Sequence, residues 1–503
     1  MEIDGGHDVD FAKQTQSFLE WFKSLPGATF HKDIELVDMR GSGAGRGIIA
    51  TADIAPDTVL FTIPRAGILC ASTSPLAAQL PAIFNQDDAA SDSAENEDDD
   101  DNSQDSWTLL ILILIREYLD PNSKWKPYLS ILPSTFTTPM FWPPTLLSHL
   151  QSSSILPKIG HASATAMIQS RILPIIASHP TLFFPPGSTP LPEADLTTLA
   201  HRCGSAIMAY AFDLETDDQD PPQDQDDDEW IEDRDGKTML GMVPMADMLN
   251  ADAEFNAHIN HGEEALTATS LRAIKKGEEI LNYYGPLGNG ELLRRYGYVT
   301  AKHAQYDVVE VPWGLVEGRL RARFAGLSGE QWEAVRGYVK EQEEEEEEEE
   351  GEAEDAFVLE REGEDPDAEG RLHGEATFVG LPEELAERVK VFLKGVKKVA
   401  GAEGELLADK AVRKEIYLDC VLGALQDRER QYVTTLEDDE KLMRPERPVE
   451  REEMALWVRV GEKRLLREAQ SWVSRELEAA RREVSSKRER GDEDAPAAKR
   501  RRA

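Results

Sequence analysis

Residues 276–299 read KGEEILNYYGPLGNGELLRRYGYV, and within this stretch the chain passes from a predicted strand into a predicted helix. Segments 266–274 and 279–284 have the composition of two strands, and the turn 275–278 between them contains a glycine that permits a positive φ. The following ELLRRYGYV begins as a helical turn.

Two further blocks stand out earlier in the chain. They read GAGRGIIA at 43–50 and VPMADMLNADAEFNAHI at 243–259. The three blocks in this order are a much more specific signal than any one of them alone.

The N-terminal part predicts a helix followed by a compact β unit. Apolar residues recur at helical spacing over 11–25, and Pro26-Gly27 ends the pattern. Short β-like segments follow at 34–39, 45–54 and 58–64, separated by a glycine-rich loop and a turn signal.

Helical patterns dominate the rest of the chain. WTLLILILIREYLD, from residue 107, predicts a buried helix, and 196–212 predicts another. Beyond about residue 315 the chain is rich in Glu, Leu, Ala, Arg and Lys, which predicts a second, all-α domain. We expect the glutamate run at 343–350 to be a linker or loop within that domain.

The net charge of −41 over 503 residues is concentrated in three tracts, at 87–105, 213–235 and 341–356. These tracts hold 35 acids and one base, which leaves a net charge of about −7 for the remainder. The folded part is therefore only mildly acidic, and the tracts are expected to be solvated.

Cysteine use and hydropathy limit the class of protein. The three cysteines, Cys70, Cys203 and Cys420, lie far apart without CxxC spacing, so neither a disulfide framework nor a thiolate zinc site is expected. The longest apolar run is 109–115, too short to span a membrane, and the acidic N-terminus does not resemble a signal peptide. We expect a soluble intracellular protein in a reducing compartment.

Several common catalytic motifs are absent. The loop RGSGAGRGIIA does not match GxGxxG and precedes a strand, and neither GxxxxGK[ST] nor GxSxG occurs. His258 and His261 have no clear third ligand, so no metal site is expected.

The three blocks resemble those of the SET-domain lysine methyltransferases of the non-histone branch. This branch includes the Rubisco large-subunit methyltransferase, SET domain-containing protein 6 and the fungal ribosomal lysine methyltransferase 4. The last two are the nearest likeness, since WTLLILILIREYL, WKPYLSILPSTFTTPMFW and AYAFDL also resemble their intervening segments.

The resemblance implies an α+β fold with two domains. Residues 1–315 would form a SET domain of short β-sheets with a pseudo-knot, a helical insertion at about 105–240 and acidic insertions near 87–105 and 213–235. Residues 316–483 would form the all-α Rubisco-methyltransferase-type substrate-binding domain with an acidic loop at 341–356, followed by a basic tail at 484–503.

The resemblance also implies S-adenosylmethionine as cofactor. Its site would begin at Ala44, Gly45 and Arg46, where glycine allows close backbone approach. Asn250 matches the family asparagine that binds the cofactor, and Ala251 stands where many relatives have histidine. Tyr210 aligns with a further cofactor-pocket residue.

Two tyrosines match the methyl-transfer centre. Tyr284 would orient the amine, and Tyr296 would help close the cofactor and lysine pocket. Trp107 and Asp247 align with positions in the pocket for the substrate lysine. The mechanism would be an in-line displacement by a neutral lysine amine, without a dedicated carboxylate base.

The implied partner is a lysine-containing protein, either a basic ribosomal protein or another nuclear protein. Two basic clusters, Lys487-Arg488 and 499–502, predict nuclear localisation through import factors. Neither direct nucleic-acid binding nor a membrane is expected.

Two other readings of the sequence stay open. A SET scaffold could serve as a non-catalytic peptide-binding module, with Ala251 as a sign of a decaying cofactor site. Alternatively, the acidic tracts could make the protein a chaperone for basic proteins.

Overall fold

The computed structural model describes residues 5–84, 106–214, 239–350, 356–400, 405–444 and 450–493. The acidic tract predicted at 87–105 lies outside these ranges, as do most of 213–235 and the basic cluster at 499–502. No helix in the described ranges is long and apolar enough to cross a bilayer.

Short sheets build the N-terminal half. One has the order β1-β4-β10-β9, another has the order β2-β3-β11-β8, and β5-β7-β6 is smaller. A two-stranded sheet, β12-β13, packs in the C-terminal half. The strands are β1 (Thr29–Phe30), β2 (Ile34–Asp38), β3 (Arg46–Ala50), β4 (Val59–Pro64), β5 (Leu69–Cys70), β6 (Ala211–Leu214), β7 (Met239–Met242), β8 (Asn250–Ala251), β9 (Ala257–His261), β10 (Ala265–Ser270), β11 (Glu279–Asn282), β12 (Val309–Pro312) and β13 (Ala356–Leu359).

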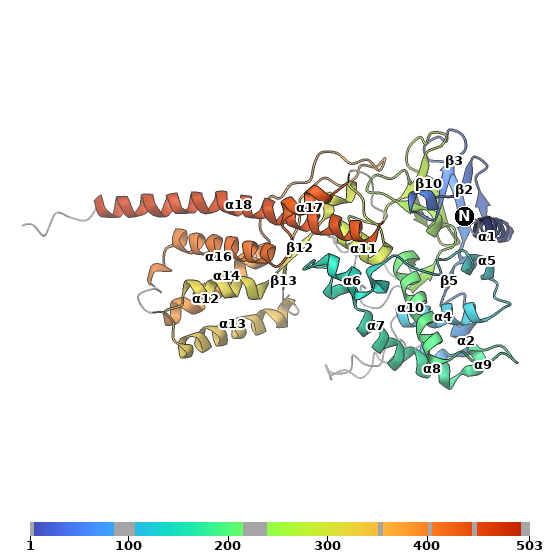
Figure 1. The fold of residues 1–503 in the computed structure, drawn as a ribbon, viewed down its shortest axis with the longest axis horizontal. Coiled ribbons are helices and arrows are strands. Elements are labelled where there is room, and N and C mark those ends of the chain that lie inside the picture. The colour runs from blue at the N-terminus through green and yellow to red at the C-terminus, as the bar shows by residue number, and fades with distance from the viewer. Residues whose placement is uncertain are drawn as a thin grey trace, which may run out of the picture.

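Helices pack beside these sheets and form the second half of the molecule (Figure 1). The longer ones are α1 (Gly5–Ser24), α4 (Ser106–Leu119), α10 (Glu193–Tyr210), α11 (Asn289–Tyr296), α12 (Trp313–Arg323), α13 (Gly329–Glu350), α14 (Glu383–Val399), α16 (Lys410–Arg430) and α18 (Arg451–Glu493). Shorter helices include α2 (Pro75–Gln79), α3 (Pro81–Phe84), α5 (Lys126–Leu129), α6 (Pro144–Leu147), α7 (His161–Met167), α8 (Leu173–Ser178), α9 (Pro180–Phe183) and α17 (Leu436–Leu442).

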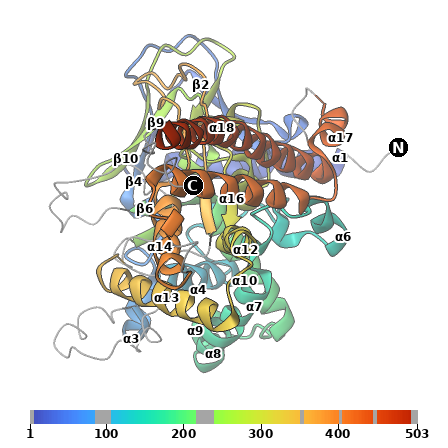
Figure 2. The same ribbon diagram turned by 90° about the vertical axis from the view of Figure 1, so that its left-hand side faces the viewer.

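The main core lies where α1, α4 and α10 meet the sheets. Residues 110–115 of α4 are each at most 2% exposed, as expected for a helix that is apolar on all sides. A second core fills the C-terminal helical half, where α16 and α18 run side by side (Figure 2). The expected combination of short sheets and a helical C-terminal region is confirmed.

Three expectations about the C-terminal half need correction. The glutamate run at 343–350 is not a loop, because α13 continues through it to Glu350. The half of α13 before the run packs Val335 and Val339 into the second core, and glutamate itself is a good helix former, so the helix propagates. The region is not purely helical, since β13 pairs antiparallel with β12, and α18 extends through the first part of the expected tail to Glu493.

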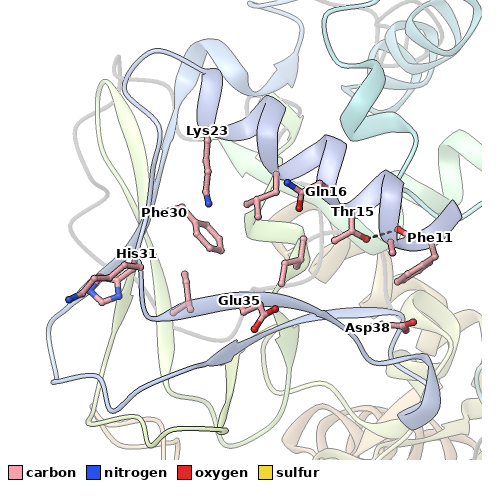
Figure 3. A pocket seen from close by; sticks show the side chains of 13 residues that line it. Phe11, Thr15, Gln16, Lys23, Phe30, His31, Glu35 and Asp38 are labelled. Carbon is pink, nitrogen blue, oxygen red and sulfur yellow. Dashed lines mark hydrogen bonds between the residues drawn. The ribbon is translucent and has the colours of Figure 1, made fainter. Parts of the chain in front are cut away.

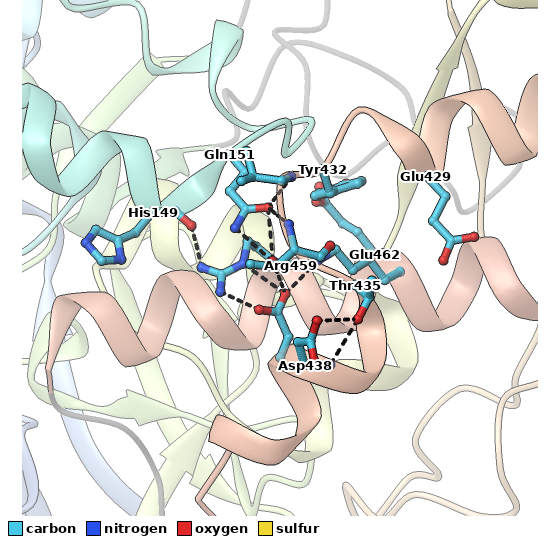
Figure 4. Close-up of polar contacts among 12 residues, drawn as sticks. His149, Gln151, Glu429, Tyr432, Thr435, Asp438, Arg459 and Glu462 are labelled. Atoms are coloured by element: carbon cyan, nitrogen blue, oxygen red, sulfur yellow. Dashed lines mark hydrogen bonds and ion pairs between the residues drawn. The ribbon is translucent and has the colours of Figure 1, made fainter.

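A buried polar cluster joins the two halves (Figure 4). Asp439 of α17 and Lys463 of α18 are both fully buried, and Arg459 is 5% exposed. The Lys463 Nζ lies 2.6 Å and the Arg459 Nη2 lies 2.8 Å from the Asp439 carboxylate. Burial raises the pKa of Asp439, but the bonds from Arg459 and Lys463 outweigh it and hold this pKa below its usual value.

The cluster also reaches the loop before α7. Arg459 donates to the carbonyl of His149, and Glu462 accepts from the Ser153 hydroxyl at 2.9 Å and the Ser154 amide at 2.9 Å. Together with the apolar contacts of Trp142 and Leu150 with α18, these bonds fix the helical half against the sheet-containing half.

We predict that Asp439→Ala destabilises the protein by about 3–5 kcal/mol, since it leaves two buried cations without their anion. Chemical denaturation measures this loss. The control is Glu440→Ala, which removes one exposed ion pair with Arg464 and should cost at most about 1 kcal/mol. Equal losses in the two variants would contradict the role assigned to the cluster.

Candidate functional site

Strand β11 brings the three sequence blocks together. Its Glu279 and Ile280 pair antiparallel with Ile49 and Ile48 of β3. On its other edge, Leu281 and Asn282 pair in parallel with Asn250 and Ala251 of β8. A late segment thus lies between two earlier ones, in agreement with the threaded arrangement that the resemblance implies.

Asn250 ties all three strands together through its side chain. Its Nδ2 donates to the Arg46 carbonyl at 3.1 Å and to the Glu279 carboxylate at 2.7 Å. Asn250 and Ala251 are both half-buried, so each keeps part of its surface open to a ligand.

The segment 44–46 forms the turn that leads into β3. The Met39 amide donates to the Gly45 carbonyl at 2.7 Å, and Gly45 has a φ of +75° with no atom within 4 Å of an added Cβ. Ala44, Gly45 and Arg46 are all half-buried. Their backbone therefore lies beside Asn250 and remains accessible.

Gly47 leaves space for three neighbouring side chains. A Cβ there would lie 2.9 Å from the Asn250 Nδ2, 3.0 Å from a Glu279 carboxylate oxygen and 2.3 Å from the Met39 sulfur. A larger residue at position 47 would therefore force these three side-chain ends to move.

Tyr284 follows β11 and is fixed at both ends of its side chain. Its hydroxyl donates to the Leu249 carbonyl at 2.8 Å, and its ring stacks on Tyr296 with centroids 4.8 Å apart. Loss of hydration, and then the neighbouring phenols of Tyr298 and Tyr296, raise the pKa of Tyr284 well above 10. The hydroxyl is therefore neutral at physiological pH.

Tyr296 is the last residue of α11, and Gly297, with a φ of +78°, ends the helix there. At the other end of α11, the Asn289 amide donates to the Asp307 carboxylate at 2.8 Å. The ring of Tyr298 lies 6.2 Å from that of Tyr296. Tyr284, Tyr296 and Tyr298 are all half-buried, so together they form a partly open aromatic wall.

Tyr283 lies apart from this wall. Its ring stacks on Phe255 at 4.7 Å, so the two consecutive tyrosines face different neighbours.

Tyr210 and Asp247 lie near the wall. Burial and the charge of Asp247 raise the pKa of Tyr210 to about 12, and Asp247 also acts on the pKa of Tyr284. Asp247 is only 6% exposed, and its carboxylate accepts from the Tyr128 hydroxyl at 2.6 Å and the Met245 amide at 3.1 Å. Both of its carboxylate oxygens thus accept hydrogen bonds inside the protein, and its place in the pocket for the substrate lysine stays a prediction.

Tyr128, which donates to Asp247, is not among the residues that the sequence predicted for the site. It lies in the block WKPYLSILP, which was matched to the family as a segment and not residue by residue.

The position of Trp107 relative to the two tyrosines is less well defined. It is half-buried at the start of α4 and packs against the main core. Among the described aromatic contacts, none joins it to Tyr284 or Tyr296, so its role at the lysine pocket stays a prediction.

Arg46 carries an unsatisfied donor. Its Nε donates to the Thr15 hydroxyl at 2.9 Å and its Nη1 to the Ile131 carbonyl at 2.9 Å, while the guanidinium lies 3.8 Å from the centre of the Phe11 ring. Its Nη2 is buried without an acceptor. Burial lowers the pKa of Arg46 to about 10, so it remains a cation that would gain from an anionic partner.

A cavity of about 340 Å³ lies between α1 and strands β1 and β2 (Figure 3). Phe11, Thr15 and Asp38 line the end of it that is nearest to Arg46. None of the predicted site residues lines this cavity. Within the described ranges, no three His, Cys, Asp or Glu side chains gather as a metal site would require.

Comparison with known proteins finds a matching protein family for each half of the chain. Residues 45–285 match the SET domain family, and residues 384–466 match the family described as Rubisco LSMT substrate-binding. The chain thus carries, in this order, a match to the SET domain family and a match to the Rubisco LSMT substrate-binding family.

Individual relatives support this grouping. The chain is 32% identical to ribosomal lysine N-methyltransferase 4 of Saccharomyces cerevisiae over 308 residues, which are 60% of this chain and 58% of that protein. It is 33% identical to N-lysine methyltransferase setd6 of Salmo salar, over 59% of this chain and 60% of that protein. These matches span less than two thirds of either relative, whereas N-lysine methyltransferase SETD6 of Homo sapiens matches at 29% identity over 86% of this chain and 85% of that protein.

The same fold occurs in a crystal structure of the SET domain of LSMT bound to lysine and AdoHcy. The two structures superpose with a TM-score of 0.61 at 18% identity, covering 93% of this chain and 92% of that one. This likeness confirms the fold over nearly the whole chain.

We predict that Gly47→Ala lowers stability by about 1–3 kcal/mol, because the added methyl group must displace the Asn250 amide or the Glu279 carboxylate. Thermal unfolding measures the effect. Gly41→Ala is the matched control, since an added Cβ there meets nothing within 4 Å. A loss no greater than that of the control would show that β3 and Asn250 are not as tightly packed as described.

Proposed function

We propose that this protein is an S-adenosylmethionine-dependent protein-lysine N-methyltransferase that acts on a non-histone protein. The observation that carries the proposal is the half-buried Tyr284–Tyr296 pair, anchored on the Leu249 carbonyl directly beside Asn250. The names of the relatives as N-lysine methyltransferases support the same class of reaction.

The residues present fit the cofactor. Its carboxylate is an acceptor of the kind that the Arg46 Nη2 lacks, and the accessible backbone of 44–45 and the Asn250 side chain offer polar groups for its amino acid part. Ala251 presents only its backbone, which suits a position where the main chain makes the contact. When bound, the cofactor supplies a methyl group on a positively charged sulfur.

The protein's part is to deliver a neutral lysine amine in line with that methyl group. A free lysine has a pKa of about 10.4, so the amine must lose a proton to water before it attacks. Partial burial among phenol rings disfavours the ammonium form. The deprotonated nitrogen would then be free to accept the methyl group that the cofactor supplies.

Tyr284 orients the amine in this scheme. Because its hydroxyl hydrogen is donated to Leu249, the oxygen lone pairs remain to accept an N–H from lysine. Tyr296 holds the Tyr284 ring by stacking and closes one side of the channel. No carboxylate base is needed.

For the substrate, we propose a basic ribosomal protein or another nuclear protein. The acidic tracts would attract a lysine-rich chain electrostatically, and one relative is named as a ribosomal lysine methyltransferase. The basic clusters of the C-terminal tail would direct the protein to the nucleus through import factors.

We predict that Tyr284→Phe reduces methyl transfer by roughly a hundredfold or more, because the amine loses the oxygen that orients it. The assay follows radiolabelled methyl from S-adenosylmethionine into a nuclear and ribosomal extract. Tyr283→Phe, whose ring packs on Phe255, is the control and should retain most of the activity.

Calorimetry of cofactor binding separates the alternatives. Binding together with a labelled band that needs Tyr284 supports the enzyme and identifies its substrate. Full activity of Tyr284→Phe would remove this residue from catalysis. Absence of cofactor binding in the wild type would favour the peptide-binding module.

Replacing the basic residues at 499–502 by alanine should lower nuclear accumulation of a fluorescent fusion severalfold, since import factors recognise clustered positive charge. Arg481→Ala combined with Arg482→Ala removes two exposed charges of α18 outside the clusters and serves as the control. Unchanged nuclear accumulation of the 499–502 variant would contradict import through this cluster.

A further inference from the structure

Tyr128 is held rigidly in the main core. It is fully buried on α5, and its ring lies 6.1 Å from Phe18 and 6.4 Å from Trp21 of α1. The neighbouring Trp125 is anchored by its indole N–H, which donates to the Gly67 carbonyl at 2.9 Å. The Tyr128 hydroxyl therefore has little freedom, and it is directed at Asp247 at 2.6 Å.

Asp247 transmits this constraint to a strained turn. Its second oxygen accepts from the Met245 amide, and Met245 has a φ of +86°, a conformation that residues other than glycine rarely adopt. Such a conformation persists only where surrounding bonds fix it. The Asp247 carboxylate supplies one of those bonds.

The turn that begins at Met245 also positions the Leu249 carbonyl, which accepts from the Tyr284 hydroxyl. The Met248 amide donates to the Met245 carbonyl at 3.1 Å, and the Leu249 amide donates to the Ala246 carbonyl at 3.1 Å. The Leu249 carbonyl then accepts from the Tyr284 hydroxyl at 2.8 Å. A continuous series of buried contacts thus runs from Tyr128 to Tyr284.

We propose that Tyr128 and Asp247 are positioning residues for Tyr284: their hydrogen bond fixes the Met245 turn and thereby the Leu249 carbonyl that orients the Tyr284 hydroxyl. This inference rests on the proposed function. It assigns Asp247 a role different from contact with the substrate lysine, because the carboxylate is buried and bonded inside the protein whereas Tyr284, Tyr296 and Asn250 keep accessible surface.

The surroundings of Asp247 make the hydrogen bonding of Tyr128 and Asp247 depend on pH. The phenols of Tyr128, Tyr210 and Tyr284 face it, and the Arg46 guanidinium acts on Tyr210; among the described contacts no Lys or Arg bonds to Asp247 itself. Burial raises the pKa of Asp247 to about 7, and the Tyr128 hydrogen bond acts against this rise. The carboxylate therefore protonates as the pH falls through about 7, which weakens its bond to the Met245 amide.

The experiment compares Tyr128→Phe with Tyr118→Phe. Tyr118 is a largely buried phenol of α4 that interacts with Arg202, so its variant controls for the loss of a core hydroxyl. We expect Tyr128→Phe to lower kcat roughly tenfold to a hundredfold, with cofactor Kd by calorimetry changed less than about threefold. The acid limb of kcat against pH should move to higher pH in Tyr128→Phe, because the pKa of Asp247 rises without its donor.

Asp247→Asn is the second variant. It keeps an oxygen for the Met245 amide but cannot titrate, so the acid limb due to Asp247 should disappear. If Tyr128→Phe fails to fold, this variant carries the test alone. A kcat and pH profile identical to those of Tyr118→Phe, or an unchanged acid limb in Asp247→Asn, would overturn the proposal.

A readout without activity separates this inference from the proposed function. Hydrogen exchange of the segment 243–249 should accelerate in Tyr128→Phe and not in Tyr118→Phe. The Asp247 carboxylate, which accepts from the Met245 amide, is no longer held in place by the Tyr128 hydroxyl in the first variant. Faster exchange in a protein that transfers no methyl would uphold the positioning of the turn and reject the proposed function. Unchanged exchange would overturn the positioning role whatever the activity.

Discussion

Strand β11 is paired on both edges, and the arrangement of the site depends on this double pairing. Because β3 and β8 occupy opposite sides of it, the backbone at residue 46 comes within hydrogen-bond distance of Asn250, which lies 204 residues away in the chain. Glycine at position 47 leaves room beside β3 for the ends of the Met39, Asn250 and Glu279 side chains. The aromatic wall follows directly from the end of this strand, since Tyr284 comes two residues after it.

Charge is handled differently in the two halves of the protein. In the buried polar cluster that joins the halves, Asp439 is neutralised by Arg459 and Lys463. The pKa of Asp439 therefore stays below its usual value. Burial raises the pKa of Asp247 to about 7, because its hydrogen-bond partners are a neutral phenol and a backbone amide, which offset the loss of hydration only in part. The first arrangement suits a permanent junction, and the second suits a site where a cationic cofactor and a neutral amine must meet.

The sequence predicted much of the fold but little of the contacts within it. The helix at 107–120 and the strands at 34–39 and 58–64 were legible because apolar spacing reports local burial. The helix through 343–350 was missed, since a run of like charges looks unfavourable until the preceding turns of α13 are seen packed in the second core. Strand β13 was missed because its pairing with β12 is a long-range contact.

By itself, the sequence determined which residue types were available: the blocks at 43–50, 243–259 and 276–299, with their glycines, Asn250 and tyrosines, carry the resemblance to the SET-domain proteins. Only the tertiary structure decided what each residue touches. It joined Tyr128 to Asp247 across 119 positions by a buried hydrogen bond. The physical reason is that periodicity encodes the buried face of an element, whereas a hydrogen bond between distant segments depends on how the elements pack.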